Sequence, residues 1–159
     1  MARDREGKCD ICTQVPESGK TGGGLVVEHD HTTGAIRGLT CGTCNHFVSG
    51  VEKALEVLEL PALLDSLRRH LDRDLGPGVT EADRKRVRAS LRERQGGRCA
   101  VCARPVERLY VDHDHDTGAI RGALCNACNI HLVAGVDRLG VQHVSVVATY
   151  LDVVVQPTL

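Results

Sequence analysis

Apolar residues recur at two different periods along this chain, and these periods predict its elements. Residues 25–27 form a short apolar run typical of a strand, and residues 35–40 look like the returning strand after the turn residues Thr33-Gly34. Residues 44–58 carry apolar side chains every three to four positions, which predicts a helix. A second helix is expected over residues 61–71, because its first residue is proline, which suits a first helical turn.

The second half of the chain repeats this order. Residues 109–111 and 120–124 predict the two strands of another hairpin, and residues 128–140 predict a helix. Residues 144–151 have helical spacing, although their valines would also suit a strand; the paired helices of the first half favour a helix. No assignment follows for residues 153–155.

The similarity between the halves extends to the residues themselves. Residues 28–38 and 112–122 differ at two positions, and each copy lies between a Cys-x-x-Cys pair upstream and a Cys-x-x-Cys-Asn sequence downstream. Such self-similarity indicates a tandem repeat. We therefore predict a first unit over residues 1–75, a linker at residues 76–79 with the sequence Gly-Pro-Gly-Val, and a second unit over residues 80–159.

Units of this size need cross-links or metal ions for stability, and the cysteines can provide them. A core below about 70–80 residues provides only a few kcal/mol, so small domains add disulfides or metal ions. Residues 1–5 are polar rather than an apolar signal stretch, so we expect a cytoplasmic, reducing location, which favours metal. No apolar run approaches the roughly 18 residues of a membrane span, so we expect no membrane contact.

The cysteine spacing is typical of two four-thiolate zinc sites. The predicted ligands are Cys9, Cys12, Cys41 and Cys44 in the first unit and Cys99, Cys102, Cys125 and Cys128 in the second. Redox pairs or a disulfide framework are the alternative. Four thiolates close the coordination sphere of Zn²⁺ and leave no position for water, so the zinc ions should be structural and the chemistry should lie elsewhere.

Charge and aromatic content limit how the chain can bind nucleic acid. The formal net charge is −1, and one Phe, two Tyr and no Trp offer little surface for base stacking. Positive charge is concentrated in a predicted helix over residues 81–95, capped by Thr80 and ended by Gly96-Gly97. A solvated helix face is the alternative reading. The candidate phosphate contacts on this helix are Arg84, Lys85, Arg88 and Arg92.

The repeated motif offers ligands for a second kind of metal ion. Mg²⁺ prefers oxygen ligands, and Asp112 with Asn129, or Glu28 with Asn45, could supply a carboxylate and an amide oxygen. An adjacent imidazole could act as general base, and the candidates are His113 and His29. Neighbouring strand residues point to opposite faces, so carboxylate and imidazole can share one ion only if the strand ends or bulges there. A hydrogen-bonded turn, or a residue that orients the zinc ligands, is the alternative role for these side chains.

At these residues the sequence resembles the recombination endonuclease VII family of His-Me finger nucleases. The resemblance rests on residues 109–115, 120–125 and 128–129 after a Cys-x-x-Cys pair; it covers residues 80–151 and, more loosely, 7–72. It implies zinc on Cys99, Cys102, Cys125 and Cys128, Mg²⁺ or Mn²⁺ on Asp112 and Asn129, and His113 as the base. His115, with His31 as its counterpart in the first half, would support the scissile phosphate.

The first half departs from the family pattern. It has Glu28 in place of aspartate, it lacks a basic helix before its first cysteine pair, and its loop at residues 13–24 is longer. A carboxylate displaced by about 1 Å can cost on the order of 10²-fold in rate, so the second site is the stronger candidate. Arg37 and Arg121 follow isoleucine in each copy and are candidate phosphate contacts, although an unpaired surface arginine is the commoner case.

These observations predict a small, zinc-stapled α+β fold of two tandem ββα-metal units with accessory helices. The expected function is a metal-dependent DNA endonuclease, acting on branched or junction DNA as the resemblance implies, with the two units forming a pseudo-dimer within one chain. A homodimer of such chains is left open. The alternatives are a nicking or restriction-type nuclease in a phage or defence context, and a zinc-dependent DNA-binding protein whose nuclease centres are inactive.

Overall fold

The computed structural model of the protein describes residues 7–17 and 23–154, with side chains up to Asp152. The start of the polar leader, part of the loop at residues 13–24, and Val155 lie outside this range. Two hairpins are each followed by a helix. The elements are β1 (Leu25–His29), β2 (Ile36–Cys41), α1 (Gly42–Leu55), α2 (Leu60–Leu71), α3 (Glu81–Arg94), β3 (Tyr110–His113), β4 (Ile120–Leu124), the π-helical segment η1 (Cys128–Val133), α4 (Ala134–Leu139) and α5 (Gln142–Val154). The predicted small α+β fold is confirmed.

The helices begin where local chemistry favours them. The Cys41 side chain accepts a hydrogen bond from the backbone N–H of Cys44 at the start of α1, and Thr80 does the same for Asp83 at the start of α3. Pro61 lies in the first turn of α2, where its missing N–H costs nothing. Residues 144–151 are helical, as the first half suggested, and α5 continues to Val154.

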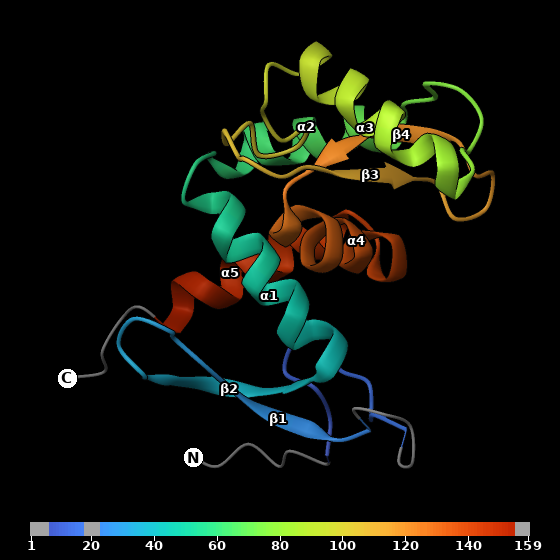
Figure 1. Ribbon diagram of the computed structural model, residues 1–159. Coiled ribbons are helices and arrows are strands. Elements are labelled where there is room, and N and C mark those ends of the chain that lie inside the picture. Colours follow the sequence, from blue (N-terminus) through green and yellow to red (C-terminus); the bar gives the residue numbers. More distant parts are fainter. Residues whose placement is uncertain (1–6, 18–22, 155–159) are drawn as a thin grey trace.

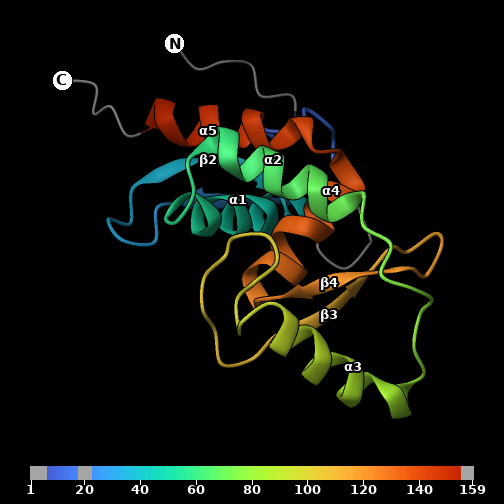
Figure 2. The ribbon, with the colours of Figure 1, turned by 90° about the horizontal axis from the view of Figure 1, so that it is seen from above.

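The two hairpins lie at opposite ends of the molecule, with helices between them (Figure 1). α1 packs against η1, α4 and α5 in the middle layer, and α3 lies beside the β3–β4 hairpin (Figure 2). The buried side chains of α1 include Phe47, Val48 and Val51, and those of α2 include Leu63 and Leu67. Among the described residues, none of the helices combines the length and the apolar character needed to cross a membrane.

The central helices cross through a reciprocal pair of close contacts. A Cβ atom on Gly50 of α1 would lie 2.5 Å from the backbone nitrogen of Leu132, and one on Gly135 would collide with the ring of Phe47. Phe47 and Leu132 are 85 residues apart in sequence, as are Gly50 and Gly135. The halves therefore pack about an approximate two-fold axis, and glycine is needed on both sides of it.

One residue is inserted in the second copy, and η1 is where the chain accommodates it. Cys44 and Cys128, the last cysteines of the two copies, are 84 residues apart, whereas the glycines at the crossing are 85 apart. A single extra residue within a helix produces a wider π turn, and η1 is π-helical between these two points. The sequence predicted a continuous helix over residues 128–140 and gave no indication of this π segment.

Candidate metal centres and active site

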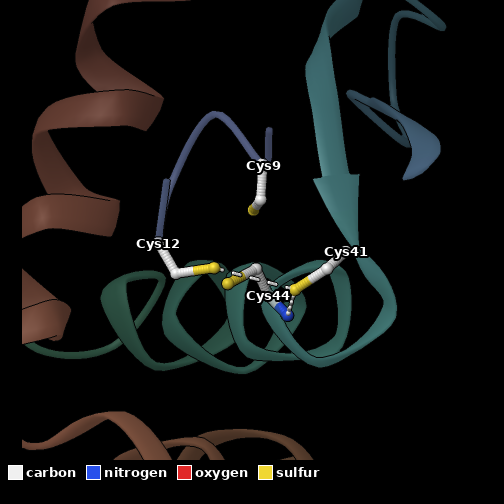
Figure 3. A group of neighbouring side chains, drawn as sticks. All are labelled: Cys9, Cys12, Cys41 and Cys44. Atoms are coloured by element: carbon white, nitrogen blue, oxygen red, sulfur yellow. Dashed lines mark hydrogen bonds between the residues drawn. The ribbon is translucent and has the colours of Figure 1, made fainter. Parts of the chain in front are cut away.

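Each half brings its four cysteines together as a compact thiol cluster. Figure 3 shows the cluster of the first half, made by Cys9, Cys12, Cys41 and Cys44. The sulfurs within each cluster lie within 4.8 Å of one another, and no cysteine forms a disulfide. The Sγ atoms of Cys12 and Cys41 are 3.9 Å apart, as are those of Cys102 and Cys125. Zn–S bonds of about 2.3 Å place tetrahedral ligands about 3.8 Å apart, so both clusters could hold zinc.

The thiol clusters fix the corner where each hairpin meets its helix. Hydrogen bonds between the thiols act in opposite directions on the two partners. The bond between Cys9 and Cys44 lowers the pKa of Cys9 to about 4 and raises the pKa of Cys44. The bond between Cys102 and Cys125 lowers the pKa of Cys125 to about 7 and raises the pKa of Cys102. Metal ligation requires thiolates, so binding of an ion would release the protons that these pairs share. Cys41 ends β2 and caps α1, and thus an ion held there would anchor the strand and the helix to each other.

A register shift interrupts both hairpins at the repeated motif. Asp112 faces Gly122 and His113 faces Ile120, so Arg121 is the extra residue on β4. The first hairpin has the same shift between Glu28 and His29, which makes Arg37 the extra residue on β2. A β-bulge of this kind redirects side chains. The interruption expected from strand alternation is therefore present, with its additional residue on the returning strand.

The bulged arginine of the second half clamps the motif carboxylate inside the protein. Arg121 Nε donates to Asp112 Oδ2 at 2.8 Å, and the Arg121 guanidinium also pairs with Asp137 at 3.0 Å. His70 Nε2 lies 2.8 Å from the same Oδ2 atom. Burial alone would raise the pKa of Asp112, but the hydrogen bonds from His70 and Arg121 outweigh it and hold that pKa below its usual value. Asp112 is therefore a carboxylate although it is only 5% exposed.

The first half has the same clamp with different partners. Arg37 pairs with Glu28 through its Nη2 at 2.6 Å and with Glu52 through its Nη1 at 2.7 Å. The Tyr150 hydroxyl donates to Glu28 Oε2 at 3.2 Å. Arg37 and Arg121 were candidate phosphate contacts on the surface. In the structure both side chains lie in the interior, each between two carboxylates.

The carboxylates of Asp112 and Glu28 differ in how tightly their oxygens are hydrogen-bonded. In Asp112, Oδ2 accepts both short hydrogen bonds, while Oδ1 accepts one long bond of 3.4 Å from Arg121 Nη2. In Glu28, Arg37 engages both oxygens at 2.6 and 2.8 Å. Asp112 Oδ1 and Glu28 Oε1 each accept one hydrogen bond, but the bond to Asp112 Oδ1 is long, so the second half offers the more weakly engaged carboxylate oxygen.

The sequence-predicted residues of the second half share one cavity of about 330 Å³. Its lining consists of Val111, Asp112, His113, His115, Asn129, Ile130, Ala134 and Asp137. The rings of His113 and His115 stack with centroids 4.9 Å apart. In the first half, His29 and His31 make an edge-to-face contact at 5.1 Å, and Asn45 lies in the first turn of α1. The second half thus combines a carboxylate, a carboxamide and two imidazoles around one space, which suits a divalent ion and a water molecule.

A larger cavity of about 680 Å³ adjoins this one, because Ile130 and Ala134 line both. His46 and His131 also line it, with ring centroids 5.2 Å apart. Burial, followed by the neighbouring charge of His46, lowers the pKa of His131. Both cavities therefore border the η1–α4 segment.

The candidate phosphate contacts of α3 divide into two kinds. Arg84 and Lys85 are exposed, and Arg84 makes an ion pair with Glu81 along the helix. Arg92 donates to the backbone carbonyls of Val106 and Glu107, and so holds a loop. Arg88 is half-buried, and its Nε has no hydrogen-bond partner among the described residues.

Four residues around the carboxylates did not stand out in the sequence: His70, Tyr150, Glu52 and Asp137. His70 follows Leu63 and Leu67 at helical spacing, so its place on the buried face of α2 was readable. Its partner lies 42 residues away, and nothing local indicates it. Glu52 and Asp137 were hidden by the inserted residue, which moves them out of register between the copies.

Comparison with known proteins identifies the family. Recombination endonuclease VII proteins match residues 1–68 and again residues 70–152. The chain belongs to the recombination endonuclease VII family. The double match is consistent with a repeat-like arrangement of the chain. The boundary at residues 76–79 stays a prediction.

Two phage proteins are similar over one segment. The Gene 59 protein of Mycobacterium phage D29 is 52% identical over 44 residues, which is 26% of this chain and 27% of that protein. The Gene 59 protein of Mycobacterium phage L5 is 58% identical over 40 residues, 23% of this chain and 24% of that protein. This chain therefore aligns with about a quarter of each relative's length. No solved structure matches significantly.

Proposed function

We propose that this member of the endonuclease VII family is a metal-dependent DNA endonuclease that hydrolyses phosphodiester bonds, and that its second half carries the working centre. The observation that supports this most directly is the 330 Å³ cavity lined by Asp112, His113, His115 and Asn129. A carboxylate, a carboxamide and an imidazole around one open space can supply a metal site and a general base for the hydrolysis of a phosphodiester.

Each residue of the cavity has a distinct role in this proposal. Asp112 Oδ1 and the Asn129 carboxamide oxygen would hold a Mg²⁺ or Mn²⁺ ion, since hard oxygen donors suit these metals and Oδ1 has acceptor capacity left. The ion would supply positive charge opposite the leaving oxygen. His113 takes a proton from the attacking water as the general base. His115, stacked on His113, supports the scissile phosphate.

The remaining parts position the substrate and the centre. Zinc in the two thiol clusters would be structural, because all four ligand positions are filled by sulfur. The exposed Arg84 and Lys85 of α3 supply positive charge for phosphates on a chain whose net charge is −1. The two halves form a pseudo-dimer within one chain, which would present two related centres to a branched or duplex DNA.

A single working centre predicts a nicking enzyme, and cleavage of both strands by two working centres is the competing candidate. Nicking is favoured by the short bonds at Glu28, both oxygens of which Arg37 engages at 2.8 Å or less. A first centre whose carboxylate is held in this way would bind a divalent ion less well, and each binding event would then cut one strand.

Cleavage by matched variants tests the proposal. Zinc-loaded protein, His113→Ala and His29→Ala are incubated with supercoiled plasmid and with a four-way junction, in Mg²⁺ or Mn²⁺. Loss of a general base costs about 10²–10⁴-fold, so His113→Ala should lose cleavage on that scale while His29→Ala retains most of it. Both imidazoles are exposed, so neither change should alter folding or zinc content.

The outcomes separate the candidates. Nicked plasmid as the end product supports one centre, and linear plasmid formed without a nicked intermediate supports two. If wild-type protein leaves every substrate intact with both Mg²⁺ and Mn²⁺, the alternative of a DNA-binding protein with inactive nuclease centres is favoured.

A further inference from the structure

Each motif carboxylate receives a hydrogen bond from a helix that belongs, in sequence, to the other half. Asp112 of β3 is bonded by His70, which lies in α2 before the Gly76-Pro77-Gly78 segment. Glu28 of β1 is bonded by Tyr150, which lies in α5 near the end of the chain. The two contacts span 42 and 122 residues, and they are reciprocal.

His70 has no evident role other than this contact. Its side chain is fully buried, and Nε2 lies 2.8 Å from Asp112 Oδ2. Its other ring nitrogen, Nδ1, has no hydrogen-bond partner within the described part of the chain. Burying an imidazole that makes only one hydrogen bond costs free energy of folding, because its unpaired nitrogen loses its hydration. The hydrogen bond to Asp112 is therefore expected to have a role of its own. The neighbours Leu63 and Leu67 on the same helix face are themselves fully buried, so α2 is held firmly.

The geometry indicates what the hydrogen bond between His70 and Asp112 does. Arg121 and His70 both bond to Oδ2, which leaves Oδ1 as the oxygen with acceptor capacity in the cavity. Arg121 comes from the same hairpin as Asp112, so it alone would allow hairpin and carboxylate to move together. His70 ties the carboxylate to a second element, and α2 also contacts the second half through Ser66 Oγ, which donates to the Val101 carbonyl at 2.7 Å.

We propose that His70 is a positioning residue for the centre of the second half, supplied across from the first half, and that Tyr150 is its reciprocal counterpart at Glu28. This inference rests on the proposed function, because it concerns the ion that Asp112 would hold. Partners of this kind, which orient a metal ligand, typically change metal affinity by about 10–100-fold. The second half is then incomplete without α2, and the pseudo-dimer is required for the centre as well as for folding.

Mn²⁺ binding to zinc-loaded full-length protein without DNA provides a test that does not depend on catalysis. Mn²⁺ titrations followed by electron paramagnetic resonance are carried out on wild type, Asp112→Asn, His70→Leu, His70→Gln and Ser66→Ala. Asp112→Asn identifies the Mn²⁺ ion that belongs to the second half. His70→Leu should weaken that ion by about 10–100-fold. His70→Gln, whose amide nitrogen can reach Oδ2, should bind within about threefold of wild type.

Ser66→Ala is the matched control, because it removes one hydrogen bond between α2 and the second half while the buried Leu63 and Leu67 still hold α2 and His70 still bonds to Asp112, so its Mn²⁺ affinity should not change. Wild-type protein that neither binds Mn²⁺ nor cleaves DNA contradicts the proposed function itself. Wild-type binding that depends on Asp112 but is unaffected by His70→Leu overturns the positioning role and leaves the endonuclease intact. If His70→Leu loses its zinc or fails to fold, His70→Gln decides: affinity as weak as that of Asp112→Asn in a folded protein also overturns it.

Discussion

At the scale of single residues, the arginine of each motif is the least expected finding. Arg121 is 2% exposed and bridges Asp112 and Asp137. Burial alone would lower the pKa of its guanidinium, but hydrogen bonds to Asp137 and Asp112 raise that pKa above its usual value, so the charge is permanent. Because its positive charge lies between two carboxylates next to the cavity, Arg121 favours the ionised form of Asp112.

Removing this charge should cost stability. Arg121→Met keeps the length of the side chain but leaves Asp112 and Asp137 without their cation. Breaking a buried ion pair from one side costs about 3–5 kcal/mol, so urea unfolding of zinc-loaded protein should shift by that free energy. Arg84→Met is the control. It removes the ion pair between Arg84 and Glu81, whose side chains are 49% and 81% exposed, respectively. It should change the free energy of unfolding by less than about 1 kcal/mol. Equal midpoints for the two variants would contradict this account.

At the scale of elements, the sequence predicted what depends on side-chain period. It also indicated an interruption of the strand at the motif, but not that the extra residue would be Arg121 on the returning strand, and it gave no indication of the π turn in η1. Strands, helices and caps could be read because the period changes from two to nearly four, and because Thr80 and Pro61 occupy their favoured positions. The bulge at Arg121 and the π turn in η1 each add one residue, which hardly alters the apolar pattern. They nevertheless decide which side chains face Asp112. His113, His115 and Asn129 were readable because they belong to the repeated motif, whereas His70 needed the tertiary structure.

The basic helix gives a prediction at this scale. Lys85 is exposed on α3, where it is free to meet a phosphate, and Arg69 is exposed on α2. Lys85→Gln should weaken DNA binding and reduce the slope of log affinity against log salt by about 0.9, the value for one phosphate contact on duplex DNA. Arg69→Gln is the control and should leave the slope unchanged. Fluorescence anisotropy at several salt concentrations, in the His113→Ala background without Mg²⁺, measures both. An unchanged slope for Lys85→Gln would indicate that this face of α3 is solvated and does not contact the DNA phosphates.

At the scale of the whole molecule, the two halves depend on each other. α1 packs against η1 through Gly50 and Gly135, at contacts that leave no room for a side chain. The carboxylates are completed by α2 and α5, each from the opposite half. Joining two such units in one chain therefore does more than duplicate a centre, because each unit supplies part of the other's interior.

This dependence can be tested at the thiol cluster of the first half. Cys12→Ser removes one ligand there without touching the second half. The first cluster anchors α1, on which η1 rests, so loss of its zinc should lower the amide protection of β3, β4 and η1 as well as that of β1 and β2. Hydrogen exchange followed by mass spectrometry measures protection segment by segment, and Cys102→Ser provides the reciprocal comparison. Cys12→Ser protein that loses protection in the first half alone, and still retains zinc at Cys99, Cys102, Cys125 and Cys128, would show that the halves fold independently.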